Sequence, residues 1–175
     1  MTRIVFIATA ALFLVGCSPV LNRDIMKQGT REFSLASLCE TPQAFEGKLF
    51  IFGGFIYRTR LLEQGSQIEA VFVPVDSRGN LKTEAHREGR FLAAYPKSKG
   101  VLDPLIYKQG RKITLAGEFV GTRQGRIEKM ECVYPLFDIK EIYLWEEEKF
   151  FWPGYPYEHH NLPWYDPPAR PYPLW

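Results

Sequence analysis

Three cysteines are the most reactive side chains in this sequence, and their positions differ in kind. Cys17 ends an apolar run that starts at Ile4, whereas Cys39 and Cys132 lie far apart in the remainder of the chain. A thiol can be acylated, can pair with a second thiol, or can pack as a small apolar group. The residues around each cysteine decide which of these chemistries the sequence favours.

The residues before Cys17 are typical of an export signal. Arg3 is the only charge in residues 1–16, and the stretch from Ile4 to Val15 is apolar apart from one threonine. A charged start followed by a short apolar core is the pattern of a secretory signal peptide, and the run is too short for a bilayer-spanning helix. We therefore expect residues 1–16 to be removed.

The sequence LVGC at residues 14–17 resembles the lipobox of bacterial lipoproteins. This resemblance implies a diacylglyceryl thioether on Cys17, cleavage before it, and acylation of the new amino group. Each buried methylene contributes about 0.8 kcal/mol, so several acyl chains would hold the protein firmly in a membrane. Ser18 stands where an aspartate would imply inner-membrane retention, so the resemblance implies the outer membrane. A secretory signal with an incidental cysteine is the alternative.

Cys39 and Cys132 are predicted to form a disulfide. Export would place them in an oxidising compartment, where two thiols pair more often than they stay free. Closing so long a loop would stabilise the fold by about 4 to 5 kcal/mol in the chain-entropy model. Nothing in the sequence brings the two residues together, so a buried apolar thiol stays open as the alternative.

The carboxylates and histidines do not form a catalytic arrangement. Asp76 is better explained as a turn former and Asp103 as a helix cap, and Glu84 is the third candidate acid. The histidines lie in predicted loops: His86, His159 and His160. Hydrolysis would need paired carboxylates or an activated nucleophile in a cleft. We predict that the protein is not an enzyme; a cell-wall glycan or lipid modifying enzyme is the alternative.

The sequence predicts no metal, cofactor or nucleic acid as a ligand. Glu158, His159, His160 and Asp166 are close in sequence, but adjacent histidines in a proline-rich segment lack the fixed spacing of a tetrahedral site. The formal net charge of +2 gives little general attraction for polyanions. Six basic residues could form a patch for lipid A phosphates or peptidoglycan, although a solvated surface is preferred: Arg58, Arg60, Arg87, Arg90, Arg111 and Lys112.

The elements that must position these side chains are mainly strands. Strand-like patterns occupy residues 48–59, 68–76, 89–96, 112–120, 126–133 and 136–145. Short helical turns are predicted at 41–47 and 103–110, a turn at 121–125, and a bulge or bend at Gly53 and Gly54. These elements predict a mainly β fold, a small OB-like barrel of five or six strands with one or two short helices. A β-sandwich is the alternative.

The chain divides into four segments on this interpretation. Residues 1–16 are the lipoprotein signal peptide, and residues 17–30 are polar without a regular period and are predicted to be a tether. Residues 31–149 form the barrel domain. Residues 150–175 form a tail rich in proline, tryptophan and tyrosine.

Several stretches in this order after the lipobox resemble the Slp (starvation-lipoprotein) family of Gram-negative outer membrane lipoproteins. The stretches are GGFI, IEAVFVPVDSRGN, GRFLA, LDPLIYKQGRKITLAGEFVG and the stretch from YP to IYLW. The likeness covers residues 45–145 and is most specific over residues 89–121. It implies an outer membrane lipoprotein that faces the periplasm, is associated with starvation or envelope stress, and has no known enzyme activity. The two later cysteines are not part of the family pattern.

The C-terminal tail combines frequent prolines with large aromatic side chains. We expect an extended path there, with Trp152 and neighbouring rings folded back on the barrel. Alternatively the tail docks a partner or lies at lipid headgroups, which makes Trp152, Trp164 and Trp175 candidate partner-binding residues. The sequence therefore predicts a lipid-anchored binding or structural module of the cell envelope. Its predicted partners are the membrane, through the anchor, and an envelope protein, glycan or lipid headgroup.

Overall fold

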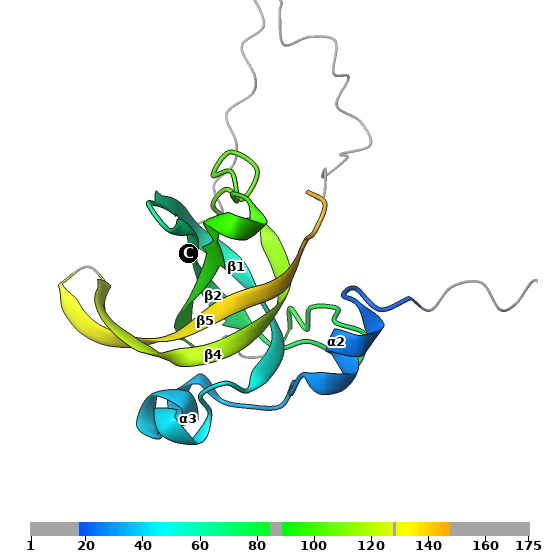
Figure 1. The fold of residues 1–175 in the computed structure, drawn as a ribbon, viewed down its shortest axis with the longest axis horizontal. Helices are drawn as coiled ribbons and strands as arrows, with labels where there is room; N and C mark the ends of the chain where they lie inside the picture. The colour runs from blue at the N-terminus through cyan, green and yellow to red at the C-terminus, as the bar shows by residue number, and fades with distance from the viewer. Residues whose placement is uncertain (1–17, 85–88, 128, 148–175) are drawn as a thin grey trace, which may run out of the picture.

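The computed structural model describes residues 18–84, 89–127 and 129–147, which form a five-stranded closed barrel with short helices beside it (Figure 1). The helices are α2 (Arg23–Gln28), α3 (Leu35–Glu40) and the 3-10 helices η2 (Pro42–Ala44) and η3 (Lys97–Lys99). The strands are β1 (Leu49–Leu62), β2 (Gly65–Val73), β3 (Arg90–Pro96), β4 (Lys112–Ile127) and β5 (Met130–Leu144). The predicted OB-like barrel is confirmed, and the sandwich alternative is wrong.

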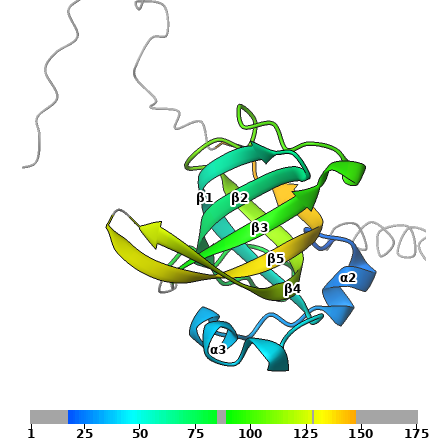
Figure 2. The same ribbon diagram turned by 60° about the vertical axis from the view of Figure 1, so that its left-hand side comes forward.

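The strand order around the barrel is β1-β2-β3-β5-β4. Neighbouring strands are antiparallel except β3 and β5, whose parallel pairing from Leu92 with Leu136 to Ala94 with Asp138 closes the barrel. β1 pairs with β4 from Leu49 to Phe55 and with β2 from Gly53 to Leu62, so the residues from Gly53 to Phe55 pair on both sides. The far halves of β4 and β5 leave the barrel as a two-stranded hairpin, which projects to one side (Figure 2).

This hairpin differs from the sequence prediction. Residues 121–125 were expected to form a turn, but they continue β4 in register with β5, from Gly121 with Leu136 to Gly125 with Cys132. Register and packing against β5 explain the two glycines instead. Gly121 has a φ of 120° beside a register shift, and Gly125 lies under the ring of Tyr134.

The barrel interior is filled by phenylalanine rings that alternate with outward side chains along the strands. Phe52 is fully buried, and its ring centroid lies 4.6 Å from that of Phe137 and 4.9 Å from that of Phe91. Phe33, which precedes α3, lies over one end of the core with its ring 4.6 Å from that of Phe50. The aromatic core fixes the barrel on which every surface site is built.

Gly53 and Gly54 do not form the predicted bulge. The register of β1 and β2 is regular at both glycines and shifts between Ile56 and Arg58. A side chain at Gly53 would meet the side chain of Leu81 and the carbonyl oxygen of Ile113. The close approach of these two groups therefore explains why position 53 is a glycine.

Residues 18–30 are not a free tether, which corrects the predicted boundary at residue 31. Leu21 and Met26 are buried in a second apolar cluster with Ile51 on the outside of the barrel. The Val20 amide donates to the Arg78 carbonyl at 2.9 Å. α2 begins after Asn22, whose side chain accepts from the backbone of Asp24. The folded unit therefore includes the chain from Val20 onward.

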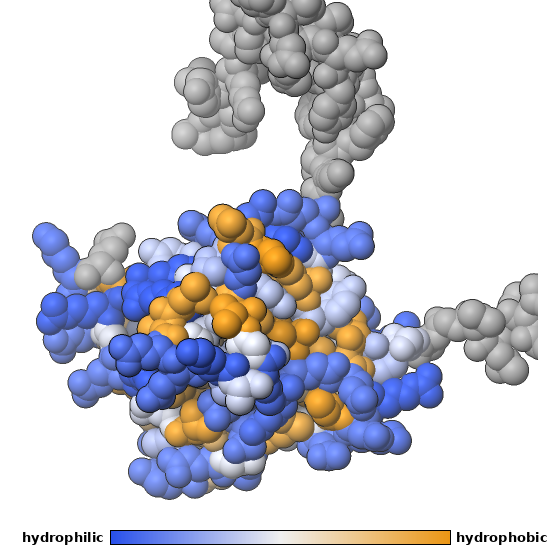
Figure 3. Space-filling model, turned by 45° about the horizontal axis from the view of Figure 1, so that its top comes forward, coloured by the Kyte–Doolittle hydropathy of each residue, from blue (hydrophilic) through white to orange (hydrophobic). Residues whose placement is uncertain are grey.

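Hydrophobic side chains are also exposed on the connection between β3 and β4. Val101, Leu105 and Ile106 are exposed there. Figure 3 shows hydrophobic patches among hydrophilic side chains on the face that it views. Within the described ranges, no helix is both long enough and apolar enough to cross a bilayer.

Asp76 forms the predicted turn. Its Oδ1 accepts from the amides of Arg78 and Asn80, and its Oδ2 accepts from the Asn80 side chain at 2.8 Å. Burial acts to raise the pKa of Asp76, but these hydrogen bonds outweigh it, so its pKa lies below the ordinary value. This turn carries the Arg78 carbonyl that holds Val20.

Replacement of Asp76 with asparagine should make the free energy of unfolding fall less steeply as the pH is lowered from 7 to 3. A carboxyl with a folded pKa below its unfolded value of about 4 stabilises the fold above that pH, and the contribution is lost as pH falls through the folded pKa. Urea unfolding from pH 7 to pH 3 measures this slope. Asp24→Asn, at an exposed carboxylate, is the control; an unchanged slope in Asp76→Asn would contradict the prediction.

Candidate functional site

A cavity of about 300 Å³ opens on the outside of the barrel beside the β4–β5 hairpin. We call it the arginine pocket; it is lined by Arg58, Arg60, Gln67, Glu69, Leu92, Arg123, Gln124, Gly125, Arg126 and Tyr134. These residues come from all five strands. OB-type barrels bind ligands on the face of strands 2 and 3, between the loops that join strands 1 and 2 and strands 4 and 5. The arginine pocket lies at that position.

A β-bulge in β1 turns the arginines toward the pocket. Ile56 pairs with Ala70 and points into the core, and the register then shifts so that Arg58 pairs with Glu69. The extra residue is Tyr57, and it allows Arg58 to lie on the outer surface where strict alternation would bury it. Arg60 follows two residues later on the same face.

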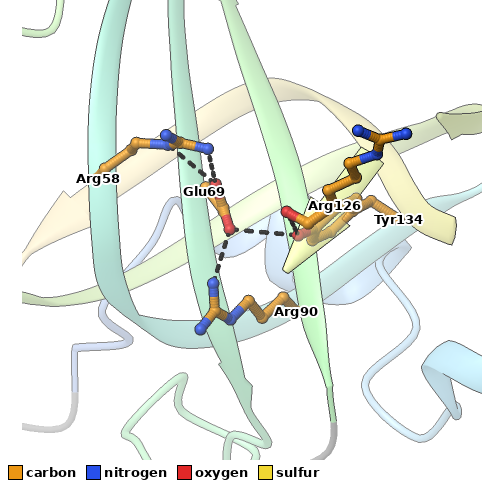
Figure 4. A network of polar contacts seen from close by, with 5 residues as sticks. All are labelled: Arg58, Glu69, Arg90, Arg126 and Tyr134. Atoms are coloured by element: carbon orange, nitrogen blue, oxygen red, sulfur yellow. Dashed lines mark hydrogen bonds and ion pairs between the residues drawn. The ribbon is translucent and has the colours of Figure 1, made fainter. Parts of the chain in front are cut away.

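Glu69 is the centre of the polar network in this pocket (Figure 4). Its side chain is only 5% exposed. Oε2 accepts from Arg58 Nε at 3.0 Å and Nη2 at 2.8 Å, and Oε1 accepts from Arg90 Nη1 at 3.0 Å. The Tyr134 hydroxyl donates to Oε1 at 3.4 Å. The carboxylate thus ties β1, β2, β3 and β5 together.

The hairpin contributes Tyr134 because a glycine makes room for its ring. A side chain at Gly125 would come within 2.6 Å of the Tyr134 ring. Tyr134 therefore reaches across to Glu69 and to the carbonyl oxygen of Arg126, at 3.4 Å from each. Burial, a hydrogen bond with Cys132 and the charge of Glu69 raise the pKa of Tyr134, so the phenol stays protonated at neutral pH.

Arg90 forms the edge of the network next to Tyr57. The Arg90 guanidinium carbon lies 4.1 Å from the centroid of the Tyr57 ring, a cation–π contact. Burial acts to lower the pKa of Arg90, but the hydrogen bond and charge of Glu69 outweigh it, and the pKa is raised. Arg90 is therefore a fixed positive charge beside the pocket.

The pocket carries more positive charge than its acidic residues neutralise. Glu69 is shared by Arg58 and Arg90, and Arg126 pairs with Glu131 at 3.3 Å on the surface. In the described part of the chain, neither Arg60 nor Arg123 has a hydrogen-bonded or ion-pair partner for its side chain. Both are exposed and line the cavity from β1 and β4. This arrangement can hold an anion.

Glu69→Gln should destabilise the fold by about 1 to 3 kcal/mol, because it leaves Arg58 and Arg90 without their carboxylate. The lower part of this range is expected because Arg58 is 45% exposed and therefore screened by water. Urea unfolding at neutral pH gives the free energy. Glu131→Gln is the control, since Glu131 is 83% exposed. Equal stability of the two variants would contradict a structural role for Glu69.

The predicted site residues have different outcomes. The lipid-attachment residue Cys17, the tail residues Trp152, Trp164 and Trp175, and the group around His159 lie outside the described residues. Within the described ranges, no cluster of three or more His, Cys, Asp and Glu side chains could hold a metal ion. The Asp103 side chain accepts from the Leu105 amide at 2.8 Å, within a turn rather than the predicted short helix.

Cys39 and Cys132 are free thiols in the structure, so it does not contain the predicted disulfide. They nevertheless line one apolar groove between α3 and the β4–β5 hairpin. Cys39 Sγ lies 3.8 Å from the carbonyl oxygen of Val133, the neighbour of Cys132. Burial, with a smaller contribution from Glu40, raises the pKa of Cys39. Their pairing stays a prediction.

The structure regroups the scattered basic residues. Arg58, Arg60 and Arg90 come together at the pocket, Arg87 lies outside the described residues, and Arg111 bonds to the Trp145 carbonyl at 2.6 Å.

The sequence interpretation missed Arg123, Arg126, Glu69 and Tyr134. Alternation of Gln67 and Glu69 with buried Ile68 was the available signal that these polar residues face outward.

A small closed OB-type barrel with a cationic pocket beside its β4–β5 hairpin defines the class of this protein. The model of the outer membrane lipoprotein Slp family matches residues 14–173, nearly the whole chain. The chain therefore belongs to the outer membrane lipoprotein Slp family, which confirms the resemblance found in its motifs.

Two further comparisons give more distant similarities. An uncharacterized protein of Haemophilus influenzae is 31% identical over 94 residues, which cover 53% of this chain and 49% of that relative. The match thus spans about half the length of the relative. Two crystal structures of a mitochondrial single-stranded DNA-binding protein from S. cerevisiae match 57% of this chain and 95% of theirs, with identities of 8% and 10% and a TM-score of 0.31. A TM-score this low supports no inference about function.

Proposed function

We propose that this protein is a lipid-anchored binding module on the periplasmic side of the outer membrane. Acyl chains on Cys17 hold the barrel at the membrane, and the arginine pocket binds an anionic component of the envelope. Membership of an outer membrane lipoprotein family supports the anchor. The position of the pocket supports the binding role, because OB-type barrels use this face for ligands.

The observation that carries the binding role is the pair Arg60 and Arg123. They line the cavity from β1 and β4 and have no polar partner in the described part of the chain. Guanidinium groups bind carboxylates and phosphates through two parallel hydrogen bonds. The network around Glu69 holds the strands beneath them in fixed positions. An anion would therefore meet two guanidinium groups that are carried by strands of fixed position.

The starvation or envelope-stress role that the family resemblance implies is part of this proposal. A module that holds an envelope component at the membrane would matter most when the envelope is under stress. The test compares survival of a deletion strain with its parent during starvation. Equal survival of the two strains would contradict the stress role. The binding role would then depend only on the binding experiment.

Binding is tested with residues 17–175 carrying Cys17→Ser, so that neither the acyl chains nor the apolar signal segment dominates. We expect this protein to co-sediment with purified cell envelopes at low salt. Arg60→Glu with Arg123→Glu should weaken retention by about tenfold or more, because two charge-assisted contacts become repulsive. The matched control is Arg23→Glu with Lys82→Glu, two exposed residues outside the pocket lining. Equal retention of both double variants would contradict the proposal.

A further inference from the structure

We infer that the arginine pocket binds a carboxylate-bearing glycan chain of the cell wall and not the headgroups of the membrane that holds the anchor. This inference rests on the proposed function, both for the anchor at Cys17 and for ligand binding at the pocket. It follows from three features: the short connection to the anchor, the direction in which the pocket opens, and the side chains that line it.

The connection between the anchor and the barrel is very short. The Val20 amide bonds to the Arg78 carbonyl, and the Asn22 amide donates to both carboxylate oxygens of Glu141 at 3.1 and 3.0 Å. Only three residue steps separate Val20 from Cys17. An extended chain spans at most about 3.3 to 3.6 Å per residue, so the barrel is held within roughly 10 Å of the acylated residue. The side with α2 and Arg78 must face the lipid.

The arginine pocket lies on the other side of the barrel. In both ribbon views, the β4–β5 hairpin projects away from the side occupied by α2 and the first described residues (Figures 1 and 2). This hairpin supplies Arg123, Arg126 and Tyr134 to the pocket. A short anchor on one side and a pocket on the opposite side direct the cationic surface away from the membrane and into the periplasm.

The lining of the pocket fits a sugar chain with acidic groups. The amides of Gln67 and Gln124 can bond to sugar hydroxyl and acetamido groups, and Leu92 gives an apolar contact for a ring face. A second hollow shares Gln124, Gly125 and Arg126 with the first and is also lined by Glu131, whose carboxylate makes it less suited to an acidic group. OB-type barrels are known to take oligosaccharides on this face.

The experiment again uses residues 17–175 with Cys17→Ser, which lack the apolar signal segment, and it offers three surfaces. These are purified peptidoglycan sacculi, the same sacculi with their carboxylates amidated, and vesicles of phosphatidylethanolamine and phosphatidylglycerol. We expect co-sedimentation with native sacculi, and a loss of about tenfold or more on amidation or with the Arg60→Glu and Arg123→Glu double variant. The Arg23→Glu and Lys82→Glu control should bind as the parent does, and the vesicles should bind little.

Each other outcome overturns the inference in a recognisable way. Binding to vesicles with none to sacculi would identify a lipid headgroup as the ligand. Equal binding to native and amidated sacculi would show that carboxylates are not recognised. Binding to whole envelopes that depends on the pocket, but to neither sacculi nor vesicles, would leave the proposed function in place and point to an envelope protein. Loss of pocket-dependent envelope binding would remove the proposed function itself.

Discussion

Cys17→Ser, expressed behind a secretory signal peptide that is cleaved without lipidation, should transfer the protein from the membrane fraction to the soluble fraction of the native host. Three acyl chains of ordinary length would contribute roughly 30 kcal/mol of membrane affinity, so their loss leaves no comparable attachment in the described barrel. Cell fractionation measures the distribution, and intact-mass spectrometry measures the lipid mass on the N-terminal residue. No other substitution in this chain is expected to move its location so completely.

The other two cysteines provide matched controls for this prediction. Cys39→Ser and Cys132→Ser remove a thiol of the same chemistry from the barrel and should leave the protein in the membrane fraction with its lipid mass. A Cys17→Ser protein that stays in the membrane, or a parent protein that carries no lipid, would contradict the anchor.

Phe52→Ala should lower the free energy of unfolding by about 3 to 5 kcal/mol, the range for large aromatic truncations in packed cores. Phe52 is fully buried and its ring lies against those of Phe91 and Phe137. Because these rings come from β3 and β5, a cavity at Phe52 removes contacts across the middle of the barrel. Single domains have about 5 to 15 kcal/mol of stability in total, so a large share would be lost.

Urea unfolding of residues 17–175 with Cys17→Ser measures this change without the anchor or the signal segment. Leu105→Ala is the control, because Leu105 is 84% exposed and should change stability by less than about 0.5 kcal/mol. A loss below about 1 kcal/mol for Phe52→Ala would mean that the aromatic core does not hold the barrel together.

The barrel could be predicted because the local sequence of each strand shows which residues point inward and which point outward. Ile113, Leu115 and Phe119 alternate in β4 with residues that point to the outside of the barrel. The structure buries all three in the interior. A two-residue period of this kind needs no knowledge of the neighbouring strands. Short strands separated by turn residues then indicated an OB-like barrel.

The tether and the hairpin were mispredicted because their causes are long-range. Leu21 and Met26 have apolar side chains in a polar stretch, and they are buried because Ile51 provides an apolar surface on the outside of the barrel. The glycines at 121 and 125 look like turn residues, yet Gly125 is needed beneath the Tyr134 ring. Neither partner is visible from the local sequence.

The arginine pocket could be predicted only in fragments. Arg58 and Arg60 were recognised as a basic pair, but their outward direction depends on the register shift after Ile56. Arg123 reaches the same cavity because β4 continues past the barrel. Strand register and the bulge decide which charges meet, and a single sequence specifies neither strongly.

Photo-cross-linking in living cells tests most directly whether a lipid-anchored barrel presents its pocket to the cell wall. A photoreactive residue replaces Gln124 in the pocket lining or Ser77 in the turn that holds Val20. We expect the probe at position 124 to capture glycan that a cell-wall hydrolase releases, and the probe at position 77 to capture phospholipid. Phospholipid captured at position 124, with no glycan there, would contradict both the orientation and the ligand.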